Sequence, residues 1–219
     1  MSVDERMVHD IVQKVMANMQ ISGSVSGMHG AFKDMNDAIN ASIEAQKKVC
    51  TMTLDQREQI ISLIRKKTHE NAEILANMGV NETGMGNVGD KILKHHLTAD
   101  KVPGTEDIST IAWSGDRGLT LVEMGPFGVI GAITPATNPS ETVICNCIGM
   151  LAGGNTVVFN PHPNAKKTTI YTINMINEAS IEAGGPDNIA VTVEAPTLDT
   201  SAIMMKHPSI HLLVATGGP

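Results

Sequence analysis

The sequence predicts an α/β protein built around a doubly wound parallel sheet, preceded by helices and a β-hairpin. Three observations lead to this prediction. After Pro126, short apolar runs alternate with stretches of the length that helical crossovers need. These runs are apolar throughout, a pattern typical of strands that helices cover on both faces. Before Pro126 the apolar residues mostly recur at helical spacing.

Composition and charge narrow the class of protein. The chain has 219 residues, 42% of them hydrophobic, enough for one large domain or two small ones. A net charge of -7, with no basic run longer than Arg65 to Lys67, argues against a nucleic-acid partner. Three cysteines, with Cys145 and Cys147 too close for an ordinary bridge, indicate a reducing compartment. We expect no membrane insertion or export, because an apolar run of bilayer length and a basic secretory leader are both missing.

The first 30 residues divide into a helix and a linker. Within residues 4–20, apolar side chains recur at offsets of three and four, which predicts an amphipathic helix over residues 1–20. Residues 21–30, ISGSVSGMHG, have the composition of a flexible tether. The apolar stripe of the helix consists of Val8, Ile11, Val12, Val15, Met16 and Met19.

Residues 31–107 are predicted to form a helical part of the main domain. The pattern is helical from Ala31 to Met78, and Thr53 with Gln56 forms a possible capping box within it. The glycines of NETGMGNVGD interrupt the pattern before a short helix near Lys91 to Leu97. The first of these helices is expected to place Phe32, Met35, Ile39 and Ile43 on one face.

Residues 108–124 are predicted to form a hairpin and residues 125–219 the parallel sheet. The strand-like runs ISTIAW and LTLVEM flank SGDRG, which indicates a turn at Gly115 to Gly118. Ligands of doubly wound sheets bind beyond the carboxyl ends of the strands. The expected strands are GVIGAI, NTVVF, NIAVTV and IHLLVA, and the segments that follow them are TPATNP, NPHP, EAP and TGGP.

Asn138 is the first candidate for chemistry. Pro135 and Pro139 restrict the backbone on both sides of it, at the end of a buried strand, so its amide would be held in one direction. A fixed amide NH₂ group is a suitable donor to a developing oxyanion. The alternative is that Asn138 caps the next helix or bonds to its own loop.

The glycine turn Thr216 to Gly218 is the second candidate. Backbone N–H groups there could receive a pyrophosphate at a helix N-terminus, although an ordinary strand-to-helix turn would look the same. The dinucleotide fingerprint G-x-G-x-x-G does not occur in the chain. Cys145 and Cys147 are interpreted as buried apolar residues rather than metal ligands, and His162, His95 and His96 as loop and surface residues.

The segment PFGVIGAITPATNPSETVICNCIGMLAGGNTVVFNPHPNAKKT closely resembles the CoA-acylating aldehyde dehydrogenases of bacterial microcompartments. The resemblance covers essentially the whole chain. It implies an incomplete Rossmann-like cofactor domain, with the catalytic domain absent from the chain. Further matching motifs, in order, are NETGMG, GDK, PGTED, GDRGLTLVE, GGPDNIAVTV and ATGGP.

The resemblance assigns roles to the candidate residues. Asn138 matches the oxyanion-hole asparagine of the family. Thr134, Pro135 and Ala136 would border the nicotinamide of the cofactor, and Thr216, Gly217 and Gly218 its phosphates. Asn160, with His162 and Pro163, matches the loop near the adenosine, where ordinary aldehyde dehydrogenases have a lysine.

The implied reaction is the NAD-dependent oxidation of a short aliphatic aldehyde, propionaldehyde or acetaldehyde, to its acyl-CoA, with NAD and coenzyme A as cofactors. The family's nucleophilic cysteine lies downstream of the glycine turn, and Cys50, Cys145 and Cys147 do not match it. We therefore expect this chain to be the cofactor-binding N-terminal half and to be inactive alone. The alternatives are a fragment of a hydrolysing aldehyde dehydrogenase and a non-catalytic shell-cargo or assembly module.

The resemblance also implies partners and a location. The hairpin of residues 108–124 would pair with a second subunit. Residues 1–20 resemble the peptides that attach enzymes to microcompartment shells, in a helix-in-groove mode, although a helix packed on its own body is the alternative. The expected location is the bacterial cytoplasm, in the microcompartment lumen.

Overall fold

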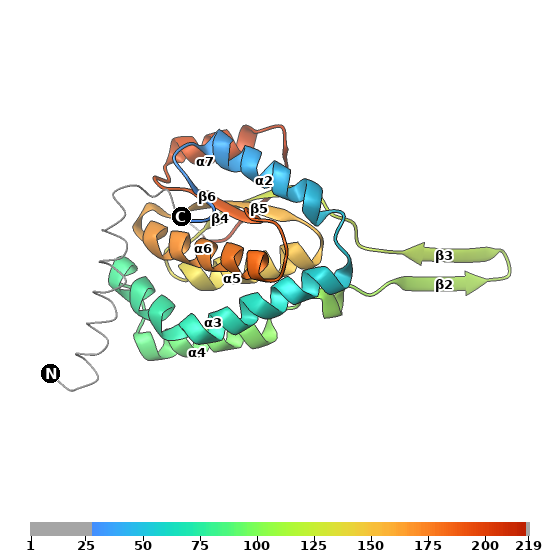
Figure 1. Ribbon diagram of the computed structural model, residues 1–219, viewed down its shortest axis with the longest axis horizontal. Helices are drawn as coiled ribbons and strands as arrows, with labels where there is room; N and C mark the ends of the chain where they lie inside the picture. Colours follow the sequence, from blue (N-terminus) through green and yellow to red (C-terminus); the bar gives the residue numbers. More distant parts are fainter. Residues whose placement is uncertain (1–27, 218–219) are drawn as a thin grey trace.

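The computed structural model describes residues 28–217 (Figure 1). Its centre is a five-stranded parallel sheet in the order β1-β6-β5-β4-β7, and a separate two-stranded hairpin projects away from it (Figure 1). The doubly wound parallel sheet was therefore predicted correctly. The strands of the sheet are β1 (Ala31–Phe32), β4 (Val129–Thr134), β5 (Thr156–Pro161), β6 (Ala190–Val193) and β7 (Ile210–Ala215).

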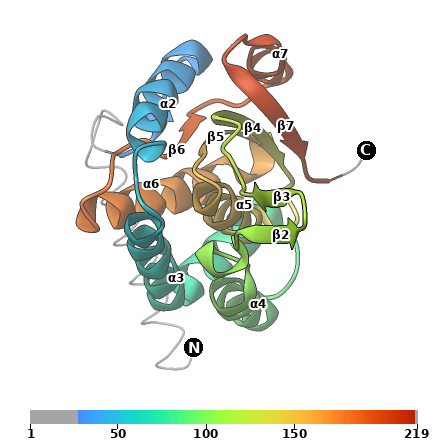
Figure 2. The same ribbon diagram turned by 90° about the vertical axis from the view of Figure 1, so that its right-hand side faces the viewer.

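Helices cover both faces of the sheet, as Figure 2 shows. On one face lie α2 and α7; on the other lie α5 and α6, with α3 and α4 packed outside them. The helices are α2 (Met35–Val49), α3 (Leu54–Thr83), α4 (Val88–Lys101), α5 (Pro139–Ala152), α6 (Lys166–Glu182) and α7 (Leu198–Lys206), with short 3₁₀ turns at Thr105–Asp107 and Pro163–Ala165.

The core has two parts, one on each face of the sheet. Along β5, Val157 and Phe159 pack with α3, α5 and α6, whereas Val158 packs on the opposite face with α2 and α7. All three side chains are buried, which explains why the middle of the strand is apolar on both faces. Phe159 is the largest fully buried side chain of β5 and belongs to the part of the core that contains α5 residues.

The strand order contains a switch point. From β4 the chain proceeds to β5 and β6 on one side, and then returns to place β7 on the other side of β4. In open α/β sheets, the crevice outside the carboxyl ends at such a point is where ligands bind. The segments that follow β4 and β7 are those that carry Asn138 and Thr216.

Several predicted boundaries needed correction. The expected helix from Ala31 begins instead at Met35, because Ala31 and Phe32 form β1 against Thr192 and Val193 of β6. A two-residue strand is too short to show a period of its own, so helical spacing was assigned in its place.

The helices after residue 50 follow the prediction more closely. The capping box is confirmed, with Gln56 N donating to Thr53 Oγ1 and Thr53 N to Gln56 Oε1. However, α3 continues past Met78 to Thr83, and α4 is longer than expected because Asn87 caps it and the helix starts at Val88.

The hairpin consists of β2 (Ile111–Gly115) and β3 (Gly118–Val122), paired antiparallel with Asp116 and Arg117 in the turn. Its location was predicted correctly. Every residue of both strands is exposed. The hairpin therefore has no packing partner within residues 28–217 (Figure 1).

Some predictions concern residues outside the described range. They are the amphipathic helix 1–20, most of the linker 21–30, and Gly218. Within residues 28–217, the helices are too short or too polar to cross a membrane. In the same part of the chain, His, Cys, Asp and Glu do not gather in threes at metal-binding distance.

Candidate functional site

The turns that follow β4 and β7 lie against each other. Thr216 N donates to Ile133 O at 3.0 Å, which continues the β4–β7 pairing up to the glycine turn. A Cβ atom on Gly217 would lie 3.4 Å from Pro135 Cβ. Gly217 has a φ of 123°, a backbone conformation that favours glycine. The two segments that the sequence singled out thus adjoin at the switch point.

Asn138 immediately precedes α5, but its side chain does not cap the helix. The first residue of α5 is Pro139, a residue type that is common at this position of helices. The Asn138 side chain turns instead to α4, where Lys94 Nζ donates to its Oδ1 at 3.2 Å. The capping alternative is therefore wrong for the side chain.

Lys91, one turn before Lys94 on α4, holds the backbone of the same loop. Its ammonium group donates to Thr137 O at 2.8 Å and lies 3.5 Å from Glu141 Oε1 on α5. Only 3% of the Lys91 side chain is exposed. A buried lysine needs an anionic partner and hydrogen-bond acceptors, and here Glu141 and the Thr137 carbonyl supply them.

His95 is the third α4 residue that reaches this segment. Its Nδ1 lies 2.7 Å from the Lys91 carbonyl oxygen, and its Nε2 lies 2.8 Å from Ser140 Oγ. Burial lowers the pKa of His95, although the Glu141 carboxylate acts in the opposite direction. Since a carbonyl can only accept, the neutral ring carries its proton on Nδ1 and accepts from the Ser140 hydroxyl at Nε2.

The assignment of His95 to the surface was wrong, because the ring is fully buried between α4 and α5. His162, by contrast, lies on an exposed loop as predicted. His96 is partly exposed and lies with its Nδ1 2.7 Å from Nδ1 of His69 on α3. Adjacent residues of a helix point in different directions, and this explains why His95 is buried whereas His96 is partly exposed.

The residues predicted to border the nicotinamide follow β4 directly. Thr134 is buried, and its Oγ1 has no hydrogen-bond partner among the described residues. Pro135 is half-buried and Ala136 almost fully buried. The predicted role of these residues in binding a cofactor remains a prediction.

Asn160, at the end of β5, uses its side chain to anchor α7. Its Oδ1 accepts from Thr200 Oγ1 at 2.7 Å and its Nδ2 donates to Ser201 Oγ at 2.6 Å. Only 4% of the residue is exposed. An adenosine contact from this amide would have to replace these bonds, whereas His162 and Pro163 beside it are exposed.

Cys145 and Cys147 are ill suited to act as nucleophiles. Burial raises the pKa of both thiols, and Cys147 is fully enclosed in the core on the α5 side of the sheet. Their interpretation as buried apolar residues is confirmed for Cys147 and agrees with the partial burial of Cys145. Cys50 is the C-cap residue of α2 and lies close to Gln46, which contacts the amino end of β5, whereas the candidate site follows the carboxyl ends of the strands.

The sequence analysis missed the cluster on α4. Its signal was present in GDKILKHH, where Lys91, Lys94 and His95 are spaced by three and four residues and so share one face of a helix. What the sequence could not show is that this face meets the loop before α5.

Comparison with known proteins supplies the family. Residues 13–219 match the model of the aldehyde dehydrogenase family. The chain belongs to this family. An acetaldehyde dehydrogenase (acetylating) of Bilophila wadsworthia is 46% identical over 223 residues, which cover 98% of this chain and 46% of that protein.

Solved structures of aldehyde dehydrogenases agree with the fold. A propionaldehyde dehydrogenase from the fucose utilisation bacterial microcompartment of Clostridium phytofermentans is 71% identical, with a TM-score of 0.86 over 87% of this chain and 44% of that one. The propionaldehyde dehydrogenase of Rhodopseudomonas palustris with bound propionyl-CoA is 47% identical, with a TM-score of 0.84, over 87% of this chain and 42% of that one. An engineered glycolyl-CoA reductase with bound NADP⁺ is 46% identical, with a TM-score of 0.84 and coverage of 87% and 44%.

The resemblance to acylating aldehyde dehydrogenases is thereby confirmed. The chain spans less than half the length of these relatives, between 42% and 46%. The described part of this aldehyde dehydrogenase chain shares the fold of the region that it matches in these relatives, and at its switch point Lys94 of α4 donates to Asn138.

Proposed function

We propose that the chain forms the cofactor-binding part of an NAD-dependent, CoA-acylating aldehyde dehydrogenase that acts on acetaldehyde or propionaldehyde. The observation that carries this proposal is the junction of β4 and β7. There, the oriented amide of Asn138 and the open glycine turn at Gly217 follow neighbouring strands at the switch point of the sheet. The names of the relatives support the class of reaction.

The residues at the junction suit a nucleotide. Thr216 and Gly217 are exposed, so a phosphate could reach their peptide groups, and Gly217 has a positive φ that favours glycine. NAD, when bound, supplies the hydride acceptor that aldehyde oxidation requires. In the proposed arrangement Thr134 to Ala136 border the nicotinamide and Asn160 to Pro163 border the adenosine. Coenzyme A would use the same groove, and the relatives with bound propionyl-CoA and NADP⁺ support both kinds of ligand.

Asn138 supplies the electrostatic part of catalysis in this proposal. When a nucleophile adds to the aldehyde carbonyl, negative charge develops on the carbonyl oxygen, and the NH₂ group of Asn138 donates a hydrogen bond to it. Removing one such donor typically lowers kcat by about 10²–10³-fold. The amide is fixed before the substrate arrives, so little reorganisation is required during the reaction.

We place the nucleophile outside this chain. Burial raises the pKa of the Cys145 and Cys147 thiols, and Cys50 lies toward the amino ends of the strands, away from the junction of β4 and β7. The relatives are more than twice as long as the matched region, so they have room for a further domain. The 219-residue chain alone should therefore form no acyl-CoA, and measurable turnover by the purified chain would refute this part of the proposal.

Calorimetric titration of the purified chain with NAD⁺, NADP⁺ and coenzyme A tests the cleft directly. We expect NAD⁺ and coenzyme A to bind and to compete. Gly217→Val should weaken NAD⁺ binding by at least about tenfold, or about 1.4 kcal/mol, because a branched residue is strained at this φ. Asn138→Ala should change it by less than about twofold, since this amide acts on the reacting carbonyl. Absence of binding at millimolar nucleotide, or an unchanged affinity in Gly217→Val, would contradict the proposal.

The proposed partners are a second copy of the chain and a microcompartment shell protein. The second copy would cover the exposed hairpin of β2 and β3, and the shell protein would bind residues 1–20, in the microcompartment lumen of a bacterial cytoplasm. Deleting residues 1–20 should abolish co-localisation with shell protein while the far-UV circular dichroism of the remainder is retained. Co-localisation that survives the deletion would count against targeting by this segment.

A further inference from the structure

One face of α4 holds four residues of the segment that carries Asn138. Lys91 binds Thr137 O and Glu141, Lys94 binds Asn138 Oδ1, and His95 contacts Ser140. We infer that Lys94 is a positioning residue for the Asn138 amide, and that it determines the direction in which the NH₂ group can donate. This inference rests on the proposed function of Asn138.

The chemistry of lysine determines which end of the amide faces α4. An ammonium group has three donors and no acceptor, so the atom 3.2 Å from Lys94 Nζ must be the amide oxygen. The NH₂ group then points away from α4. Among the described residues, Asn138 Nδ2 donates to none. Asn138 is partly exposed, so the amide can offer both hydrogens to a ligand.

The other α4 residues leave the amide little freedom except rotation about its own side-chain bonds. Lys91 and Glu141, both nearly buried, fix the carbonyl of Thr137 on one side of Asn138. Fully buried His95 fixes Ser140 on the other side. The backbone at Asn138 is thus held at both ends, and rotation of the side chain is the freedom that remains. Lys94 is the residue that restrains it.

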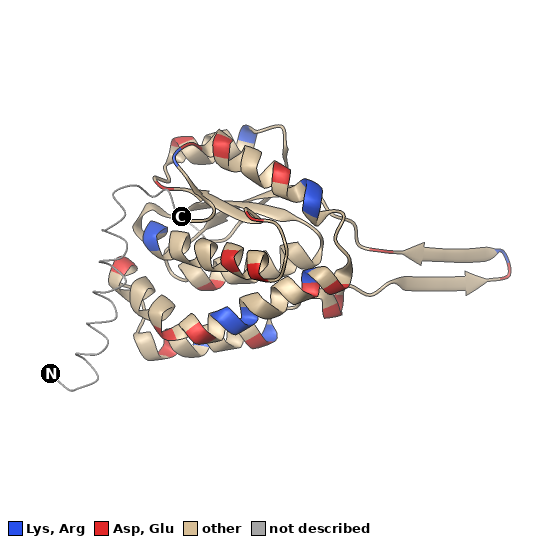
Figure 3. Ribbon diagram, in the orientation of Figure 1, with Lys and Arg blue, Asp and Glu red and all other residues tan. Residues whose placement is uncertain are grey.

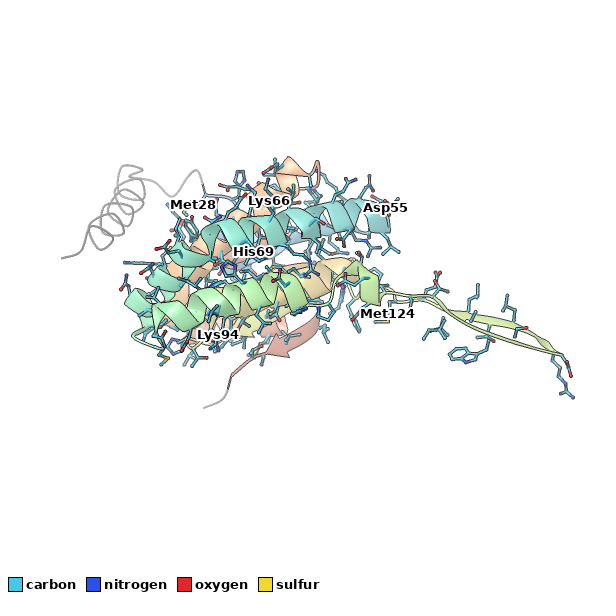
Figure 4. All side chains as sticks on the ribbon, turned by 90° about the horizontal axis from the view of Figure 1, so that it is seen from below. Met28, Asp55, Lys66, His69, Lys94 and Met124 are labelled. Atoms are coloured by element: carbon cyan, nitrogen blue, oxygen red, sulfur yellow. The ribbon has the colours of Figure 1, made fainter. Side chains whose placement is uncertain are left out.

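Lys94 is suited to this role because its removal should not disturb the fold. Figure 4 shows Lys94 on α4, on the side of the helix that faces away from α3, whereas His69 lies between the two helices. Lys94 is exposed and outside both core clusters. Substitutions at such surface positions usually change stability by less than about 0.5 kcal/mol. An effect on the amide can therefore be separated from an effect on folding.

The test is side-chain ¹⁵N relaxation of the whole 219-residue chain. The Asn138 NH₂ signals are identified by their loss in Asn138→Ala. In the unsubstituted chain we expect a side-chain order parameter that approaches the value of about 0.85 known for rigid backbone groups, and in Lys94→Met a fall below about 0.6, the range of flexible groups. Lys94→Arg, which retains a cationic donor, should restore rigidity, whereas a purely structural role for Lys94 would not require a donor. Lys101→Met, an exposed lysine on the same helix, is the matched control and should leave the signals unchanged.

An Asn138 order parameter in Lys94→Met equal to that of the unsubstituted chain would overturn the inference. So would a fall of the same size in Lys101→Met, because the effect would then be unspecific. The measurement needs neither nucleotide nor turnover, so it is independent of the calorimetric titration described above. If the chain did not bind nucleotide, the proposed function would be wrong. The relaxation data would still decide whether Lys94 orients the Asn138 amide.

Discussion

Asn138 occupies the N-cap position of α5, but its side chain does not cap the helix. Its amide oxygen accepts instead from Lys94 on α4, which is a charged donor. The side chain is thereby directed away from its own helix. At the scale of single residues, an amide that is free of local backbone bonds is available for recognition.

His95 provides a prediction about pH at the same scale. Its folded-state pKa is lowered by burial, so the unfolded chain, with a pKa of about 6.5, takes up a proton at a higher pH than the folded chain. The stability from a neutral His95 is thus present above about pH 6.5 and is lost as the pH falls toward the folded pKa. The free energy of unfolding should decline by up to about 1.4 kcal/mol per pH unit in this range, as measured by urea unfolding.

Two variants isolate the contribution of His95. His95→Gln retains a donor and an acceptor, and it should flatten the decline below pH 6.5 even if it is less stable at pH 7.5. His162→Gln, at an exposed loop position, should retain the slope of the unsubstituted chain. If the free energy of unfolding declined with falling pH equally in the unsubstituted chain and in His95→Gln, other titratable groups would be responsible for the loss of stability in acid.

At the scale of elements, α3 stabilises the ends of three other helices. Arg57 donates to Ala152 O at the end of α5, and Arg65 donates to Ala99 O and Val102 O at the end of α4. Glu82 accepts from Lys167 N and from Thr168 N at the start of α6, each at 2.7 Å. The positive arginines lie at helix C-termini and the negative Glu82 at a helix N-terminus, so each charge is opposite to the partial charge of the terminus that it contacts. Figure 3 shows both kinds of charge distributed along α3.

Glu82 is the contact whose loss should be most visible. Glu82→Ala should lower the free energy of unfolding by about 2 kcal/mol, because two N–H groups at the start of α6 and the Thr168 hydroxyl lose a charged acceptor. Chemical denaturation measures this change. Glu73→Ala, at an exposed position of the same helix, serves as the control and should stay within about 0.5 kcal/mol. Equal losses in the two variants would mean that Glu82 acts only through helix propensity.

At the scale of the whole molecule, the described part of the chain has a covered sheet and an uncovered hairpin. The sheet gains apolar burial on both faces, whereas the hairpin exposes Trp113, Leu119 and Leu121, each with more than half of its surface accessible. A two-stranded hairpin with no packing partner is marginally stable in water. Exposed apolar groups of this size mark an interaction surface, and a second copy is the partner that we propose.

Size-exclusion chromatography with light scattering tests this proposal. The unsubstituted chain should self-associate at micromolar concentration, and the double variant Trp113→Ser, Leu121→Lys should shift the population toward monomer by at least about tenfold in dissociation constant. Asp116→Ser, in the hairpin turn, is the matched control and should leave association intact. A monomeric unsubstituted chain, or a double variant that associates equally well, would exclude the hairpin as the interface.

The parts of the fold that could be predicted are those whose pattern is local. Strands β4, β5 and β6 were located because burial on both faces leaves continuous apolar runs in the sequence. The run IHLLVA located β7 as well, although its residues alternate between partly buried and exposed. β1 was missed because only two residues pair, and its strand conformation depends on β6, about 160 residues away in the sequence. For the site, the prolines on both sides of Asn138 indicated that residue, and the glycine turn indicated Gly217.

The sequence alone determined the layered α/β architecture, the hairpin and the two segments that meet at the switch point. The reason is that buried strands and turns each produce a pattern in consecutive residues. Only the tertiary structure decided the direction of the Asn138 amide and the burial of His95. The physical reason is that both depend on contacts between α4 and α5 that join residues 44 and 45 positions apart, and such contacts leave no periodic signal in either segment.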